Sequence, residues 1–369
     1  MLVYIISDVD KSLGLEWVLE KIKKKIETRV VLINCKATKL EKFLINNNIE
    51  YKNLIFKKKY LDTFKSIFKL IRILYGWRAT IVHCHLRKAS ILGIFSAFFL
   101  GVKKRIYTRH HGSESQHIFA EYLIDKLTFL MSTDILAISE ITKNLTILNT
   151  PSSEKKIKKL YHGFNFDYFN SLNNSKINFL RKKYNISENV FVVGAISRLV
   201  DWKNIDKIID SFLLFKSKHN NSILILANVN FNTRYSLKIK QKLNIISKKN
   251  YRIIKFEEDI KYLYKIFDIF IHIPKLSDKE AFGQTYIESL LLKTPCIFSN
   301  TGVAKEFTKH LKNSYICNPN NKYSIYRGLE YLKINTFKGK FMINNGYRFV
   351  KLKFSLKEHI HQLYKIYNS

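Results

Sequence analysis

Apolar residues along the first half of the chain follow two alternating spacings. Short continuous runs predict buried strands, and each run is followed by a segment with apolar positions three or four residues apart, which predicts a helix. The pairs are Leu2–Ser7 with Leu13–Lys25, Arg29–Asn34 with Lys39–Asn46, and Ile81–His83 with Ser90–Leu100, and further strands are predicted at Arg105–Tyr107 and Ile135–Ile138. This order predicts an α/β fold, with a parallel sheet covered by helices on both faces.

A second series of strands begins after residue 190. Its members are Val190–Ile196, Ile223–Ala227, Arg252–Phe256, Ile269–Ile273 and Pro295–Ser299, and it ends near Ile316. The intervening segment Asn165–Asn185 is rich in Asn, Ser and Lys, and we predict that it is a linker. We therefore expect two Rossmann-like domains that face each other across a cleft, because ligands of open α/β sheets bind beyond the carboxyl ends of the strands.

The net charge and the cysteine content limit the classes of protein to which this chain can belong. The 64 Lys and Arg against 29 Asp and Glu leave a net charge of +35, which favours phosphate-bearing substrates, an anionic membrane or nucleic acid. Abundant Lys, Asn and Ile with only 12 Gly and 4 Pro also fit an AT-rich genome, so part of the charge reflects codon usage. No nucleic-acid-binding motif is present, and we expect no nucleic-acid partner. The four cysteines lack CxxC spacing and Leu2–Ile6 indicates a strand rather than a signal peptide, so we expect a cytoplasmic protein.

One predicted helix, Phe56–Leu74, is both basic and amphipathic. Its apolar stripe consists of Leu61, Phe64, Phe68, Ile71 and Leu74. Such a helix can lie on the anionic inner face of the cytoplasmic membrane. Alternatively, it can pack against the domain with its basic face in water. Both interpretations stay open. The most apolar stretch, Ala89–Val102, is too short to span a bilayer and is predicted to be a core helix.

The run from Glu280 to Glu288 places two glutamates around a Phe-Gly turn. It follows a predicted strand and precedes a predicted helix, so it lies in a strand-to-helix loop. Free N–H groups at the start of a helix favour an anion, Gly283 lets the backbone approach a ligand closely, and the two carboxylates can hold hydroxyls. An alternative is that Thr285-Tyr-Ile-Glu288 forms a capping box, which would make Glu288 purely structural.

A second strand-to-helix loop carries two cations. Arg198 and Lys203 follow the strand Val190–Ile196, and apolar positions from Ile205 onward predict a helix. A guanidinium and an ammonium near the positive end of a helix can bind a diphosphate without a metal ion. In a chain with 64 basic residues, two cations on a loop are also expected by chance.

These motifs carry a resemblance to a known family. The segments Ser197–Asp206, Glu280–Glu288 and Thr294–Glu306 resemble, in order and spacing, the C-terminal half of the retaining glycosyltransferases of family four, also called glycosyl transferases group 1, which have the GT-B fold. Leu160–Phe169 is similar to the interdomain segment of the family. The end of the chain is similar to its last helix, which crosses back to the first domain.

The resemblance implies domains and site residues. It implies an acceptor-side domain over residues 1–165 together with a C-terminal helix of about residues 352–369, and a donor-binding domain over residues 166–351. Arg198 and Lys203 are expected to hold the donor diphosphate, and Glu288 the ribose. Glu280 is expected to engage the donor sugar with the backbone of Phe282, Gly283, Gln284 and Thr285.

The first half matches the family less sharply. The segment that ends in His110-His111-Gly112 looks like the region where the family places a histidine beside the donor sugar and acceptor, and we favour His110 over His111. The family usually has a Gly-Gly pair in its first loop, where this chain offers only Gly14 near the phosphates. Strand alternation would send His83 and His85 to one face and Cys84 to the other, which argues against a shared metal ion. The Asp8-Val-Asp10 pair is interpreted as a loop, and no metal is expected.

The expected activity is therefore transfer of a sugar from a UDP- or GDP-linked donor to a hydroxyl of a glycan or lipid-linked acceptor, with retention and without a cofactor. Assembly of bacterial surface polysaccharide or lipopolysaccharide is the expected setting. The alternatives are a sugar-nucleotide epimerase or phosphorylase of the same fold, and a protein that binds polyanions without catalysis.

Overall fold

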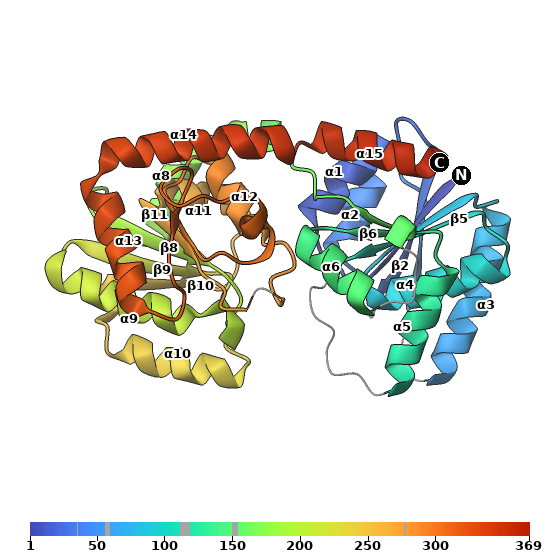
Figure 1. The fold of residues 1–369 in the computed structure, drawn as a ribbon, viewed down its shortest axis with the longest axis horizontal. Helices are drawn as coiled ribbons and strands as arrows, with labels where there is room; N and C mark the ends of the chain where they lie inside the picture. The colour runs from blue at the N-terminus through green and yellow to red at the C-terminus, as the bar shows by residue number, and fades with distance from the viewer. Residues whose placement is uncertain (35, 56–59, 111–118, 150–153, 277) are drawn as a thin grey trace. The chain divides into compact units, whose positions relative to one another are not determined.

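A computed structural model describes residues 1–34, 36–55, 60–110, 119–149, 154–276 and 278–369. The chain divides into two compact units (Figure 1). Unit 1 comprises Met1–Asn165 and Phe354–Ser369, and unit 2 comprises Phe166–Lys353. Among the described residues, none of the helices has both the length and the hydropathy of a membrane span.

Unit 1 is built on a seven-stranded parallel sheet in the order β3-β2-β1-β4-β5-β6-β7. The strands are β1 (Leu2–Ser7), β2 (Thr28–Asn34), β3 (Tyr51–Ile55), β4 (Ile81–His85), β5 (Lys104–Arg109), β6 (Asp134–Ala137) and β7 (Ile157–Lys159). The helices are α1 (Leu13–Ile22), α2 (Lys39–Asn46), α3 (Tyr60–Gly76), α4 (Arg87–Phe99), α5 (Phe119–Met131), α6 (Glu140–Asn149), the short η1 (Glu154–Lys156) and α15 (Leu356–Asn368).

Close packing of α4 on the sheet depends on a small residue. A Cβ built on Gly93 would lie 2.5 Å from Sγ of Cys84 and 2.7 Å from Cδ1 of Ile5, so α4 rests directly on β4 and β1. Ala89 and Ala97, one turn to either side, are fully buried on the same face. Ala89–Val102 therefore contains a core helix, as the sequence predicts.

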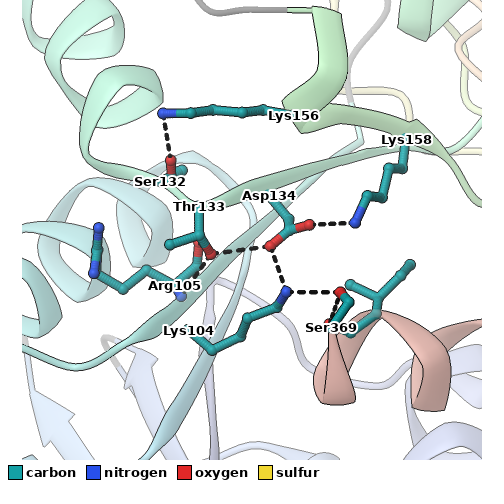
Figure 2. A network of polar contacts seen from close by, with 9 residues as sticks. Lys104, Arg105, Ser132, Thr133, Asp134, Lys156, Lys158 and Ser369 are labelled. Atoms are coloured by element: carbon teal, nitrogen blue, oxygen red, sulfur yellow. Dashed lines mark hydrogen bonds and ion pairs between the residues drawn. The ribbon is translucent and has the colours of Figure 1, made fainter.

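The C-terminal helix α15 belongs to unit 1. Phe164 and Ser355 form a parallel bridge at its start, and the hydroxyl of Tyr367 near its end lies 2.7 Å from that of Tyr4 on β1. Figure 2 shows a further link, in which Lys104 donates to Oγ of Ser369 at 3.0 Å and pairs with Asp134 at 3.0 Å. The last helix is thus attached to the sheet of unit 1 along its length.

Unit 2 has a six-stranded parallel sheet in the order β10-β9-β8-β11-β12-β13. Its strands are β8 (Phe191–Ile196), β9 (Ser222–Ala227), β10 (Tyr251–Ile254), β11 (Ile269–His272), β12 (Cys296–Phe298) and β13 (Tyr315–Ile316). Its helices are α7 (Phe166–Asn170), α8 (Asn174–Lys183), η2 (Asp201–Lys203), α9 (Ile205–Lys218), α10 (Arg234–Asn244), η3 (Lys248–Asn250), α11 (Ile260–Ile266), α12 (Gln284–Leu291), η4 (Gly302–Glu306), α13 (Lys322–Ile334) and α14 (Thr336–Lys353). The predicted fold class is confirmed, since both units are parallel α/β structures of the Rossmann type.

The prediction of a linker at Asn165–Asn185 is wrong. This segment contains α7 and α8, and the side chain of Asn173 caps α8 by accepting the N–H of Ser175 at 2.8 Å. The ammonium of Lys261 donates to the carbonyl oxygens of Tyr168 and Ser171 at 2.7 and 2.8 Å, which holds the turn after α7 against α11. Only one residue of α8, Leu180, is buried. The helix therefore has many polar residues and few apolar ones, and its sequence is similar to that of a linker.

Helix α3 differs from the predicted stripe. Leu74 is fully buried, together with Leu70, whereas Phe68 is 71% exposed. Two apolar ridges therefore run along α3, one packed on the core and one in solvent, and the prediction merged residues from both. Residues 56–59 lie outside the described residues, as do the side chains of Leu61 and Phe64.

Candidate active site

Two loops of unit 2 bring a lysine and a glutamate together. Lys203 ends the turn η2, which follows β8, and Glu280 stands in the loop between β11 and α12. The Lys203 ammonium forms an ion pair with Oε2 of Glu280, and the two side chains are only 11% and 7% exposed. The same ammonium lies 4.5 Å from the centroid of the Trp202 ring. The residue predicted for the diphosphate thus contacts the residue predicted for the donor sugar.

His272 is a further partner of Glu280. It is the last residue of β11, its side chain is 2% exposed, and its Nε2 lies 3.2 Å from Oε2 of Glu280. Both contacts of the carboxylate therefore go to Oε2. Within the described part of the chain, Oε1 of Glu280 has no hydrogen-bond partner, so this oxygen is available to a ligand.

The Glu280 carboxyl is a buried anion. Burial alone would raise its pKa, but the contacts with His272 and Lys203 outweigh burial and lower the pKa to about 2. Burial lowers the pKa of His272 to about 4, and the nearby Lys203 charge adds to this effect, so the imidazole is neutral at neutral pH. A neutral imidazole that faces a carboxylate carries its proton on the facing nitrogen, and His272 Nε2 therefore donates to Glu280. Burial also lowers the pKa of Lys203, although Glu280 opposes that shift.

Two glycines leave room for the Glu280 loop. Gly283 has φ of 82°, and a Cβ there would lie 2.6 Å from the Tyr286 ring and 3.3 Å from Oε1 of Glu280. Gly302 has φ of 54°, and its Cβ would lie 2.6 Å from the carbonyl oxygen of Glu280. Side chains at these positions would be strained and would displace the glutamate. Gly283 also keeps open the space beside the unpartnered oxygen.

Glu288 does not form the capping box that its spacing suggests. Helix α12 begins at Gln284 with Gly283 as its N-cap, so Thr285 is already inside the helix and cannot cap it. The carboxylate of Glu288 instead accepts the hydroxyl of Tyr264 at 2.7 Å. Burial raises the pKa of Glu288, and the Tyr264 hydrogen bond opposes this. The capping-box interpretation of Glu288 is therefore wrong.

The remaining residues predicted for the donor also lie in unit 2. Arg198 follows β8, its side chain is exposed, and it is near enough to Lys203 for its charge to lower the lysine pKa. Phe282 is buried and Gln284 is exposed. The hydroxyl oxygen of Thr285 is buried with no hydrogen-bond partner among the described residues, which suits a position that a ligand completes.

Unit 1 contains a cluster of histidines at the ends of β4 and β5. Nε2 of His110 lies 3.1 Å from Nδ1 of His85, and the His110 ring stacks on His162 with centroids 5.5 Å apart. The rings of His83 and His85 are 4.4 Å apart on one face of β4. Cys84 lies on the opposite face, in the core with Ile5, so the predicted alternation is confirmed.

Three other predictions fall in unit 1. Gly14 is the second residue of α1, and a Cβ there would meet no atom within 4 Å. His111 lies outside the described residues. Asp8 pairs with Lys88 at 2.8 Å, and Asp10 accepts the backbone N–H of Lys39 at 3.2 Å, so both carboxylates have protein partners. Among the described residues, no group of three or more His, Cys, Asp or Glu side chains is arranged to hold a metal ion.

Sequence reasoning missed two contacts of the site, those of His272 and Tyr264. A signal for His272 exists, because it is the one polar residue in the apolar run Ile269–Ile273 and therefore needs a buried partner. Tyr264 carries no such signal. It lies on α11, and its contact with Glu288 arises only from the packing of α11 near α12.

Two Rossmann-like units of this kind are the architecture of the GT-B fold, which glycosyltransferases adopt. The family comparison agrees with this class. Residues 22–168 match the model of Glycosyltransferase Family 4, and residues 176–349 match that of Glycosyl transferases group 1. The chain belongs to these glycosyltransferases.

Individual relatives are similar over most of the chain. The capsular polysaccharide biosynthesis glycosyltransferase CapM of Staphylococcus aureus is 28% identical over 83% of this chain and 80% of its own length. The Anabaena protein HepE, solved in complex with UDP, superimposes with a TM-score of 0.83 at 19% identity and covers 99% of both chains. A glycosyltransferase from Rickettsia africae gives a TM-score of 0.83 at 22% identity, over 99% of this chain and 97% of the other. The two solved structures support the fold.

Proposed function

We propose that this glycosyltransferase moves a sugar from a nucleotide-sugar donor to a hydroxyl acceptor with retention of anomeric configuration. The observation that carries the proposal is the Glu280 carboxylate. Its Oε2 is fixed by Lys203 and His272, while Oε1 has no protein partner in the described part of the chain. A buried anion with one free oxygen beside a glycine is suited to accept hydroxyls of a bound sugar.

The other donor contacts follow from the loops around this carboxylate. Arg198 and Lys203 hold the diphosphate, Glu288 holds the ribose, and the backbone from Phe282 to Thr285 engages the donor sugar. Lys203 is already paired with Glu280, so a diphosphate offers it a second anion at the same place. The lysine then couples occupation of the phosphate site to the position of the sugar-binding carboxylate.

In the transfer step, the bond between the anomeric carbon and the diphosphate oxygen breaks, and the acceptor oxygen bonds to that carbon from the same face. The departing diphosphate takes the negative charge and receives the acceptor proton. Arg198 and Lys203 stabilise the charge that grows on the diphosphate, which is electrostatic catalysis by groups already in place. No metal ion is required in this scheme. Gly14 is assigned to the donor diphosphate, and His110 or His111 is assigned to the donor sugar and acceptor.

The donor base and the acceptor are inferred from relatives. The solved complexes of HepE contain UDP and UDP-glucose, which favours a UDP-linked donor over a GDP-linked one. CapM acts in capsular polysaccharide biosynthesis, which favours a growing glycan or a lipid-linked sugar as acceptor. We place the enzyme in the cytoplasm, as a peripheral protein of the inner face of the membrane, where such acceptors are assembled.

A thermal-shift screen with UDP, GDP and their sugar conjugates tests the donor site. The matching donor raises the melting temperature of the wild type and fails to do so for Glu288→Ala and Lys203→Ala. Lys240→Ala, which removes an exposed lysine of α10, is the control and keeps the shift. A radiolabelled donor with a lipid or oligosaccharide acceptor then tests transfer. Release of free nucleoside diphosphate without a glycosylated product contradicts the transferase assignment, and an inverted product contradicts retention.

A further inference from the structure

The outer surface of α3, α4 and α5 in unit 1 carries large apolar side chains in solvent. Helix α4 packs against both α3 and α5. The exposed residues, here called the three-helix surface, are Phe68 and Tyr75 on α3, Phe98 and Phe99 on α4, and Tyr122, Leu123, Ile124, Leu127 and Leu130 on α5. Large apolar side chains exposed in this number on neighbouring helices are typical of a binding site for a protein or a membrane.

The exposed apolar ridge of α3 is not part of the hydrophobic core. Leu70 and Leu74 already fill the core beneath the helix and are fully buried. The second ridge, with Phe68, Ile71 and Tyr75, lines a groove of about 390 Å³ together with Leu100 at the end of α4. Lys69 and Arg72 line the same groove, so cations flank apolar side chains there. Burial of the domain core does not explain this second ridge.

The charge of α4, and of α3 beyond Asp62, is strongly one-sided, whereas α5 carries Glu121 and Asp125, of which Asp125 pairs with Arg87 at 3.0 Å. Between Asp62 and Glu114 the sequence has no acidic residue, whereas 29 in 369 residues would place about four in a segment of that length. A genome-wide bias toward lysine codons adds cations but does not remove every carboxylate. The exposed cations of this segment are Lys65, Lys69, Arg72, Arg78 and Lys103.

We propose that the three-helix surface binds the anionic face of a phospholipid bilayer, with its aromatic and leucine side chains inserted among the lipids and its lysines and arginines on the headgroups. Apolar side chains with flanking cations match the layered chemistry of such an interface. A second copy of this chain is a poor occupant, because it would bring an equally cationic surface into contact and each chain has a net charge of +35. This inference deepens the membrane location proposed above and does not depend on the donor or acceptor.

Vesicle co-sedimentation of the full chain tests the proposal without donor or acceptor, so its result is separate from that for glycosyl transfer. The wild type binds vesicles of phosphatidylcholine with phosphatidylglycerol and binds vesicles of phosphatidylcholine alone far more weakly. Each Lys or Arg near an anionic surface contributes about 1 kcal/mol, so Lys69→Glu with Arg72→Glu lowers the partition coefficient by at least about tenfold. Added salt weakens binding of the wild type by screening the same contacts.

The apolar part is tested with Phe68→Ser combined with Phe99→Ser, which lowers the partition coefficient about tenfold even at low salt. Two matched controls lie in unit 2. Lys182→Glu with Lys240→Glu makes the same charge change at exposed lysines of α8 and α10. Phe337→Ser with Leu352→Ser removes side chains of α14 that are 83% and 84% exposed. Both controls keep wild-type binding, and circular dichroism verifies that every variant is folded.

Three results overturn the proposal. One is a wild type that does not sediment with phosphatidylglycerol vesicles. Another is an equal loss in the unit 2 controls, which would show that net charge rather than this surface drives binding. The third is concentration-dependent dimerisation in analytical ultracentrifugation that Phe68→Ser with Phe99→Ser abolishes, which would assign the surface to a second copy of the chain.

Discussion

Nε2 of His272 lies 3.2 Å from Oε2 of Glu280, and both side chains are almost completely buried. This contact fixes one oxygen of the carboxylate and leaves the other available. The imidazole donates because burial keeps it neutral, with a pKa lowered to about 4. His272 is thus a positioning residue for the proposed sugar-binding carboxylate, and we expect it to keep Glu280 in place when Lys203 binds a diphosphate.

Substitutions of His272 distinguish the effect of its hydrogen bond from the effect of its size. His272→Phe keeps a ring but removes the hydrogen bond, and we expect kcat to fall about tenfold, from the loss of roughly 1.5 kcal/mol in a bond to a charged group. The KM for the donor changes little, since the diphosphate and ribose contacts persist. The pKa of Glu280 rises because a lowering contact is lost, so the acid limb of the rate profile moves to higher pH.

His272→Gln is the matched variant. Its side-chain amide can place a hydrogen-bond donor near the position of Nε2. His272→Gln should therefore be more active than His272→Phe, and the acid limb of its pH–rate profile should lie at lower pH. Equal activity of both variants, with unchanged pH profiles, would mean that His272 only fills space beside Tyr286, whose ring lies 4.6 Å from its own.

The prediction for Glu288 concerns its contact with Tyr264. Tyr264→Phe removes the hydroxyl that donates to Glu288 at 2.7 Å while keeping the buried ring. The carboxylate is then free to turn, and we expect the KM for the donor to rise about threefold to tenfold, with kcat nearly unchanged, because the ribose contact is made in the ground state as well as the transition state. Initial rates at varied donor concentration measure this. A fall in kcat at constant KM would place Glu288 in the reacting centre instead.

Sequence patterns predicted the sheets but not the contacts between loops. Continuous apolar runs such as Leu2–Ser7 are buried throughout, so their length and apolar pattern identify them as strands. In the structure, β1 has the same bounds. The strand Tyr51–Ile55 was not predicted, because it is an edge strand without a fully buried residue. The Lys203 and Glu280 pair joins residues far apart in the sequence, and only the parallel order of β8 and β11 places their following loops together.

The same limit applies to Glu288. Local spacing suggested a capping box with Thr285, and the φ of 82° at Gly283, which no spacing reveals, moved the start of the helix. Motif resemblance nevertheless selected residues that the structure brings together, because the family spacing encodes the strand order that single-sequence reasoning lacks.

A stability prediction concerns Asp134, at the start of β6 (Figure 2). It pairs with Lys158 at 2.6 Å and with Lys104 at 3.0 Å. Burial raises its pKa, but the hydrogen bonds from both lysines outweigh burial and lower it. Asp134→Asn should therefore lower the free energy of unfolding by about 2 kcal/mol at neutral pH, and the difference should shrink as pH falls below the ordinary aspartate range and the wild-type carboxylate is protonated.

Urea unfolding at neutral and acidic pH measures this difference. The control is Asp259→Asn, which breaks an exposed pair with Lys176 and should leave the free energy of unfolding nearly unchanged. A loss in Asp134→Asn that is equally large below the wild-type titration would indicate that packing, rather than charge, is responsible.

Acid should destabilise unit 1 more steeply than a single carboxylate can explain. Four histidines of this unit are buried with lowered pKa values, about 3 for His83 and His162, about 4 for His359, and well below the ordinary value for His85. Burial is the first cause in each case, and neighbouring histidines add to it for three of them. An unfolded chain binds protons on all four near pH 6.5, whereas the folded unit binds them only at much lower pH.

The unfolded state thus holds more protons between these limits, so stability falls as pH decreases, by about 1.4 kcal/mol per pH unit for each histidine. We expect the melting temperature to drop steeply from pH 6.5 to pH 4 and to level off below the folded pKa values. His359→Gln, which retains an amide near the carbonyl oxygen of Tyr161 that Nδ1 contacts at 2.6 Å, should lower the slope by about one proton. His361→Gln changes an exposed histidine of the same helix and should leave the slope unchanged. A slope equal in all three proteins would show that the buried histidines are already charged in the folded state.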